Sequence, residues 1–231
     1  MKGYIFFITG IILLFATCKH VEKTKLDVQI YRQVDSTDYL NVIIEQSIFA
    51  SGNLQLEKSC EVLNKEIKNR IDSLKKNLQE KAGVFFSEIR KEGIERPQWN
   101  FELYVRDSVF MANSEYISLR MMVYIFEGGA HGMTQFYAYN YDVKQQKLLN
   151  PQQILDFGKS KEINELLERN FVNTDSCFTE IPTLENGVSA LNMNMEIFCF
   201  TYPQYALGSY SCGYLEVNIP RVELKEELIL K

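Results

Sequence analysis

The residues of this sequence with the chemistry for proton transfer or metal binding lie close to its middle. His131 stands between Glu127 and Asp142, and an imidazole beside a carboxylate can act as a general base. The only other histidine is His20, so the folded part cannot contain a site with two imidazoles, and the three residues lack the spacing of a metal site. We therefore expect no metal and no cofactor. A single histidine in a turn is more often a hydrogen-bonded structural residue than a catalytic one.

Other catalytic and nucleic-acid-binding signals are absent from the sequence. It contains no Gly-x-Ser-x-Gly elbow, no P-loop and no dinucleotide fingerprint, so it does not name a reaction. The net charge of -5 arises from mixed Lys and Glu segments, and no basic patch indicates nucleic acid as a partner.

Glycines surround the histidine. Gly128, Gly129 and Gly132 follow an alternating apolar segment and allow backbone angles with positive φ or the close approach of another segment. They predict a turn of fixed geometry around His131, which indicates shape rather than chemistry.

The first residues are typical of a secretory signal. Lys2 precedes an apolar run from Tyr4 to Phe15, which is shorter than the ~20 residues that span a bilayer as a helix. Phe15-Ala16-Thr17-Cys18 resembles the lipobox of bacterial lipoproteins, although Phe15 and Thr17 depart from its commoner residues. This predicts a signal peptide over 1–17, an acylated Cys18 and a polar tether over 18–25. The alternative is an ordinary cleaved signal with a chance cysteine.

The remaining cysteines permit two disulfide bonds. Cys60, Cys177, Cys199 and Cys212 can pair in three ways in an oxidising compartment, and Cys60 also fits a free thiol on the apolar face of a helix. If the strands around the Tyr202–Gly208 turn form a hairpin, Cys199 and Cys212 flank that turn and are expected to pair. Cys60 and Cys177 remain alternative partners.

Hydrophobic periodicity predicts the elements of the amino-terminal half. Alternation over 26–44 indicates a hairpin, and a stripe from Leu56 to Ile89 indicates one long amphipathic helix with Asn53 as its N-cap. A coiled coil is the more specific interpretation of that stripe, but a helix that lies across a sheet is the more common one.

Alternating strands are predicted next, at 99–105, 117–125 and 135–143. The last contains a row of tyrosines, which fits a sheet face covered by a helix better than a sugar-stacking platform. Further along, we expect a helix starting near Ser160, a loop over 173–186, strands at 191–199 and 214–219, and a closing helix over 222–228. The fold class predicted is α+β, with a mostly antiparallel sheet, one long amphipathic helix packed on it and a smaller helix.

Two local patterns resemble a known family. Gly-Gly-Ala-His-Gly at 128–132, followed by a strand ending in Tyr-Asp-Val at 141–143, and the Phe-Thr-Tyr-Pro-Gln-Tyr-Ala-Leu-Gly segment at 200–208 are similar to the extracytoplasmic carboxy-terminal domain of the lysozyme-sensing anti-sigma factor RsiV. The same domain occurs as an accessory module in some peptidoglycan deacetylases. The preceding segment resembles the companion domain, which implies a division into 26–98 and 99–231.

The resemblance implies a recognition module rather than an enzyme. The chain has neither a sigma-binding segment nor a deacetylase domain with its own metal ligands. The implied partners are the membrane, through acylated Cys18, and a lysozyme-like protein or peptidoglycan, at the outer-membrane or periplasmic face of a bacterial envelope. A cell-wall hydrolase or deacetylase-like enzyme using His131 is the alternative. The candidate ligand-binding residues are Gly128, Gly129, His131, Gly132, Tyr202 and Tyr205.

Overall fold

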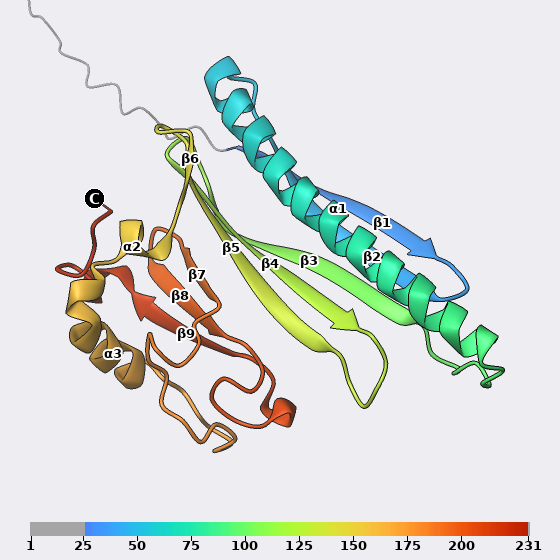
Figure 1. Ribbon diagram of the computed structural model, residues 1–231. Helices are drawn as coiled ribbons and strands as arrows, with labels where there is room; N and C mark the ends of the chain where they lie inside the picture. The colour runs from blue at the N-terminus through green and yellow to red at the C-terminus, as the bar shows by residue number, and fades with distance from the viewer. Residues whose placement is uncertain (1–25, 231) are drawn as a thin grey trace, which may run out of the picture.

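The protein has four layers (Figure 1). The computed structural model describes residues 26–230. A long helix covers one face of a six-stranded sheet, and a three-stranded sheet packs on the opposite face with a short helix beyond it (Figure 1). The α+β class predicted from the sequence is confirmed.

The first sheet has the strand order β1-β2-β3-β4-β5-β6. All its pairs are antiparallel except β2 and β3, which are parallel because the chain crosses over through the long helix between them. The strands are β1 (Asp27–Ser36), β2 (Leu40–Ala50), β3 (Phe101–Ala112), β4 (Tyr116–Phe126), β5 (Met133–Asp142) and β6 (Lys147–Leu149).

Helix α1 (Leu54–Lys91) lies across this sheet, as predicted, rather than in a coiled coil. Asn53 caps it by accepting hydrogen bonds from the backbone N–H groups of Gln55 and Leu56. The apolar stripe is buried against the sheet, where Tyr139 and Tyr141 of the tyrosine row are covered as expected. Burial of that stripe is what fixes the helix on the sheet.

The second sheet contains β7 (Ala190–Met193), β8 (Ile197–Tyr202) and β9 (Leu215–Pro220) in sequence order. Its own core packs against α3 (Ser160–Arg169), which follows the short α2 (Pro151–Ile154). The remaining helical turns are 3₁₀ segments at Phe157–Lys159, Tyr210–Cys212 and Arg221–Glu223.

Two expectations for this region are wrong. The alternating segment 191–199 is not one strand, because Asn194 turns the chain: its side chain accepts from the backbone N–H groups of Glu196 and Ile197, so β7 and β8 form a hairpin. The closing helix over 222–228 is also absent. That stretch has a single 3₁₀ turn, and Leu228 instead forms a β-bridge with Leu155.

A buried ion pair joins the two sheets. Arg120 of β4 projects away from α1, and its guanidinium donates to the Thr201 hydroxyl at 2.7 Å and to Glu216 Oε1 at 2.6 Å. The Arg120 side chain is only 8% exposed and lies 5.3 Å from the ring centres of both Phe110 and Phe136. Charge, hydrogen bonds and two aromatic rings therefore meet at one arginine between the layers.

Asp107 accepts a hydrogen bond from the β2 backbone just beyond the point where β2 stops pairing with β3. The parallel pairing with β3 ends at Glu45 and Arg106, and beyond it the carboxylate of Asp107 accepts the N–H of Ser47 at 2.8 Å. Asn64 of α1 does the same for both backbone groups of Phe49. Asp107 Oδ1 is buried without a partner among residues 26–230, and burial raises the pKa of this carboxyl to about 7.

We predict that the protein becomes more stable as the pH falls from 8 to 5. Because the pKa of Asp107 is higher in the folded state than its ordinary value of 3.8, the folded chain binds a proton that the unfolded chain does not. The free energy of unfolding should rise by about 2 kcal/mol over this range. Chemical denaturation at a series of pH values measures it.

The variant Asp107→Asn provides the control. It carries no titrating group at this position, so its unfolding free energy should stay flat between pH 8 and 5 while that of the wild type rises. A wild-type curve parallel to that of the variant would contradict the assignment. Asp35 and Glu185, whose pKa values are lowered by hydrogen bonds from Lys75 and Asn164, lose their stabilising contribution only below about pH 4.

The expected boundary between residues 98 and 99 falls within the first sheet, since β2 and β3 on its two sides pair directly. The predicted signal peptide, Cys18 and tether lie outside the described residues. Within the part of the chain that the structure covers, no helix has the length and apolar character to cross a membrane.

Candidate functional site

The glycine turn between β4 and β5 has the fixed geometry expected of it. Gly128 and Gly129 have φ values of +94° and +91°, a region that side chains rarely enter. A Cβ on Gly128 would lie 2.5 Å from the ring of Trp99, and one on Gly132 would lie 2.5 Å from the carbonyl oxygen of Ile125. Both glycines are thus required by close approach as well as by the turn.

A second turn, after β8, meets the first one. Gln204 accepts a hydrogen bond from the backbone N–H of Thr134 at 3.0 Å, which connects it to the start of β5. Tyr205 follows with a φ of 69°, in the left-handed region although it is not a glycine. Its side chain is 55% exposed. The backbone therefore holds this tyrosine outward in a costly conformation beside the glycine turn.

His131 connects the two turns. Its Nε2 lies 3.1 Å from the Tyr205 hydroxyl, its Nδ1 lies 3.1 Å from the Gly132 carbonyl oxygen, and its ring stacks on that of Tyr210 at 3.6 Å between centres. We name His131, Tyr205 and Tyr210 the aromatic platform. Its members come from two connections of the chain, His131 from the β4–β5 turn and both tyrosines from the segment between β8 and β9.

The hydrogen bonds identify one protonated nitrogen of the imidazole. A carbonyl oxygen can only accept, so Nδ1 carries a proton and donates to Gly132, whereas the Tyr205 hydroxyl can donate to Nε2 or accept from it. Both ring nitrogens are occupied by neutral partners, which fixes the orientation of the ring.

The carboxylates proposed to act with His131 lie elsewhere. Glu127 forms an ion pair with Lys81 of α1 at 2.6 Å. Asp142 is buried at the far end of β5, roughly 30 Å along the strand, where it accepts from the Gln145 N–H at 2.7 Å. In residues 26–230 no three His, Cys, Asp or Glu side chains gather in a way that could hold a metal ion.

The free cysteines are not nucleophiles either. Cys60 and Cys199 are buried, and burial raises their pKa values to about 11 and about 12, so both thiols stay protonated at neutral pH.

The predicted disulfide bond between Cys199 and Cys212 is wrong. Cys212 pairs with Cys177, at a sulfur–sulfur distance of 2.03 Å. The strands around the turn do form a hairpin, but Cys199 is buried between the two sheets, beside Arg120. The actual bond attaches the 3₁₀ turn that contains Tyr210 to the long loop before β7.

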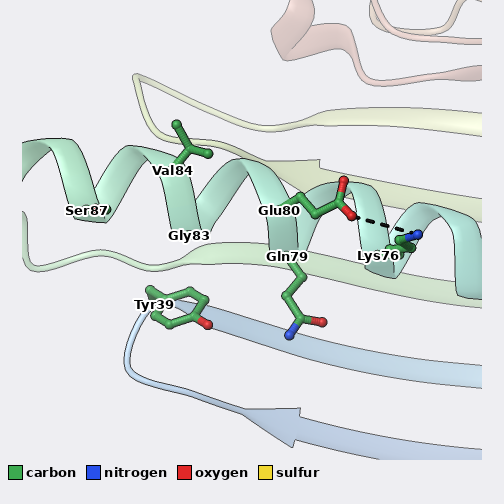
Figure 2. A pocket seen from close by; sticks show the side chains of 7 residues that line it. All are labelled: Tyr39, Lys76, Gln79, Glu80, Gly83, Val84 and Ser87. Carbon is green, nitrogen blue, oxygen red and sulfur yellow. Dashed lines mark ion pairs between the residues drawn. The ribbon is translucent and has the colours of Figure 1, made fainter.

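An open hollow with no contact to this platform lies along α1. Figure 2 shows it along the second half of α1, with a volume of about 650 Å³, where Gly83 leaves the helix surface low and Tyr39 lies opposite. Its two charged residues, Lys76 and Glu80, pair with each other at 3.9 Å. The charged side chains that line the hollow are therefore paired, and its lining contains neither histidine nor cysteine.

The candidate residues divide into two groups. His131 and Tyr205 are exposed and in contact, whereas Tyr202 is buried and donates its hydroxyl hydrogen bond to the Thr183 carbonyl at 3.0 Å, so it supports the turn from below. The glycines shape the backbone. Sequence reasoning missed Tyr210, whose only signal was its place beside Cys212, and Trp99, whose ring fills the space under Gly128.

Fold and site together define an α+β domain that presents a rigid aromatic surface without a catalytic cluster in its described residues. Residues 34–134 match the family model described as deacetylase PdaC, which covers less than half of the chain. No curated protein matches the chain in sequence.

Two solved structures share the fold. A member of the DUF3298 family from Bacteroides fragilis is 14% identical, with a TM-score of 0.64 over 90% of this chain and 95% of that one. A DUF3298 family protein from Pseudomonas aeruginosa is 17% identical, with a TM-score of 0.54 over 88% and 93% of the two chains. At these identities the likeness concerns the fold.

Proposed function

We propose that the protein is a non-catalytic recognition module of the bacterial envelope, anchored through an acylated Cys18. It binds a lysozyme-like protein or cell-wall glycan through the aromatic platform. The observation that carries the proposal is the convergence of the exposed His131 and Tyr205 with the half-buried Tyr210, held by left-handed backbone in both turns.

The physical character of the platform supports binding. Exposed tyrosines with few rotatable bonds offer apolar area and hydrogen-bonding groups at low entropic cost, which suits both protein interfaces and sugar rings. Nearby along the chain, Tyr214 is 42% exposed and its ring lies 4.9 Å from that of Phe136, in a tilted contact. With both ring nitrogens hydrogen-bonded, His131 contributes shape to the platform.

The comparisons support the same class of function. Residues 34–134, which match the PdaC model, contain no group of His, Cys, Asp and Glu side chains that could hold a metal ion, which is compatible with an accessory module. The two DUF3298 structures share the fold of nearly the whole chain.

We predict that Tyr205→Ala and Tyr210→Ala each weaken binding by about tenfold or more, because each removes an aromatic ring from the centre of the surface. The measurement is the dissociation constant for hen lysozyme and for purified peptidoglycan fragments. Tyr31→Ala is a matched control, since Tyr31 is 52% exposed on β1, far along the sheet from the platform. Equal affinities of all three variants and the wild type would remove the platform from the proposal.

The enzymatic alternative is tested with the same material. Peptidoglycan fragments incubated with the protein, with and without added divalent metal, should show neither cleavage nor deacetylation. Turnover that His131→Ala abolishes at an unchanged melting temperature would replace the recognition module with an enzyme.

A further prediction concerns the anchor. Cys18→Ser should release the protein from the membrane fraction, because acyl chains contribute ~0.8 kcal/mol for each buried methylene and the variant carries none. Fractionation with and without the substitution, followed by mass spectrometry of the amino-terminal peptide, measures this. A variant that stays in the membrane would show that the apolar segment itself is the anchor.

A further inference from the structure

We propose that the groove between the β1–β2 hairpin and α1 binds a single-chain carboxylate amphiphile such as a medium-chain fatty acid. The groove has a volume of about 640 Å³, within the range of small-molecule sites. Its lining residues come from β1, β2 and α1. Figure 1 shows these three elements side by side at the β1 edge of the first sheet. The aromatic platform lies outside it, so this inference is independent of the proposed function.

The floor of the groove is apolar at both ends. Ile44 and Ile48 of β2 point toward α1, which contributes Ile71 from above. Tyr31 forms the outer wall on β1 and remains 52% exposed because the helix does not cover this strand. A narrow apolar slot of this shape favours an extended hydrocarbon chain over a compact polar ligand.

One polar group in the floor lacks a partner. Gln46 lies between the two isoleucines along β2 and opposite Tyr31 in the register, and its residue is only 5% exposed. Its Nε2 is buried with no acceptor among the described residues, although a buried amide donor is costly to leave unpaired. The unfilled donor lines the groove and calls for an acceptor oxygen from a ligand.

The charges around the groove select an anionic ligand. The charged side chains lining it are Lys65, Lys68 and Lys75 against Asp72, three positive and one negative. Lys68 pairs with Asp72 at 2.5 Å, and Lys75 pairs with Asp35, which does not line the groove. Lys65 has no ion pair in the described part of the chain, so its ammonium is available to a ligand.

These features fit one ligand chemistry. A carboxylate accepts a hydrogen bond from Gln46 Nε2 while its charge faces Lys65, and the attached acyl chain lies against the isoleucines and Tyr31. A neutral alcohol of the same length would leave the lysine unused. An alkylammonium would meet lysines and a donor amide, with which it cannot pair.

The test measures dodecanoate binding to the purified full chain in lipid nanodiscs, with empty nanodiscs subtracted. Isothermal titration gives the dissociation constant, and dodecanoate labelled with ¹³C at the carboxyl carbon reports a separate bound resonance. We expect dodecanoate to bind at least tenfold more tightly than dodecanol, and dodecyltrimethylammonium not to bind. Failure of the wild type to bind dodecanoate, or equal affinity for dodecanol, overturns the proposal.

Substitutions separate the site from the fold. Gln46→Leu should weaken dodecanoate binding at least tenfold while leaving the melting temperature unchanged or raised, since it removes an unpaired buried donor. Lys65→Gln should weaken binding severalfold, and Lys161→Gln on α3 is the matched control with no expected effect. Unchanged affinity in Gln46→Leu would contradict the assignment of the head group to this position.

Discussion

Replacing Gly128 by Ala is expected to destabilise the protein by about 2–5 kcal/mol. The substitution imposes positive φ on a side chain, and it places a Cβ 2.5 Å from the ring of Trp99. That ring cannot move freely, because it packs against Phe85, Phe101 and Phe126 at 5.5, 6.1 and 5.6 Å between centres. Denaturant unfolding followed by tryptophan fluorescence measures the loss, and Trp99 is the only tryptophan in the chain.

A substitution at the neighbouring glycine distinguishes the cost of backbone strain from the cost of the steric clash with Trp99. Gly129 has nearly the same φ, but a Cβ there meets nothing within 4 Å, so Gly129→Ala should cost only about 1–2 kcal/mol. The fluorescence spectrum of the folded protein should change in Gly128→Ala alone. Equal losses in the two variants would mean that the contact with Trp99 has no energetic weight.

Arg120→Met is expected to cost about 3–5 kcal/mol. It leaves the carboxylate of Glu216 and the hydroxyl of Thr201 without their donor between the two sheets. Methionine keeps much of the apolar volume between Phe110 and Phe136, so the loss reports the charge rather than a cavity. Thermal or denaturant unfolding provides the measurement.

The control is an arginine on the neighbouring strand. Arg106 pairs with Glu45 at 4.0 Å with 64% of its side chain exposed, so Arg106→Met should cost less than about 1 kcal/mol. Adding Glu216→Gln to Arg120→Met should recover part of the stability by removing the unpaired charge. A loss in Arg120→Met no larger than that in Arg106→Met would refute the role of the ion pair.

The long helix and the long strands could be predicted from the sequence because each is defined by one local signal, the spacing of its apolar residues. The stripe of α1 and its cap at Asn53 depend on residues three and four apart, which the chain displays directly. The alternation of β4 and β5 likewise follows from residues two apart. Placement of the helix on the sheet was predicted because a single apolar stripe of this length more commonly packs across a sheet than in a coiled coil.

The missed features depend on contacts between distant segments or on one side chain. The turn at Asn194 interrupts an alternation that continues in phase on both sides, so periodicity alone reads one strand. The partner of Cys212 was ambiguous because the course of the long loop around Cys177 has no periodic signal. The role of Arg120 could not be predicted either, because its hydrogen-bond partners lie far along the chain, on β8 and β9.

For the candidate site, the sequence indicated the two turns but not their meeting. Three glycines around His131 marked a constrained backbone, and the structure places Tyr205 against this histidine as part of one surface. Tyr210 carried no signal of its own. Its stacking on His131 depends on the path of the chain between β8 and β9, which nothing local specifies.

The disulfide bond between Cys177 and Cys212 makes the shape of the aromatic platform depend on oxidation. Tyr210 lies two residues from Cys212 in a single 3₁₀ turn, and that turn is attached to a loop 35 residues earlier by the disulfide. A newly made chain in a reducing compartment lacks this constraint, so one face of the histidine would be covered by a freely moving segment. Only oxidation then completes the shape of the platform, which makes its maturation a property of the compartment as much as of the sequence.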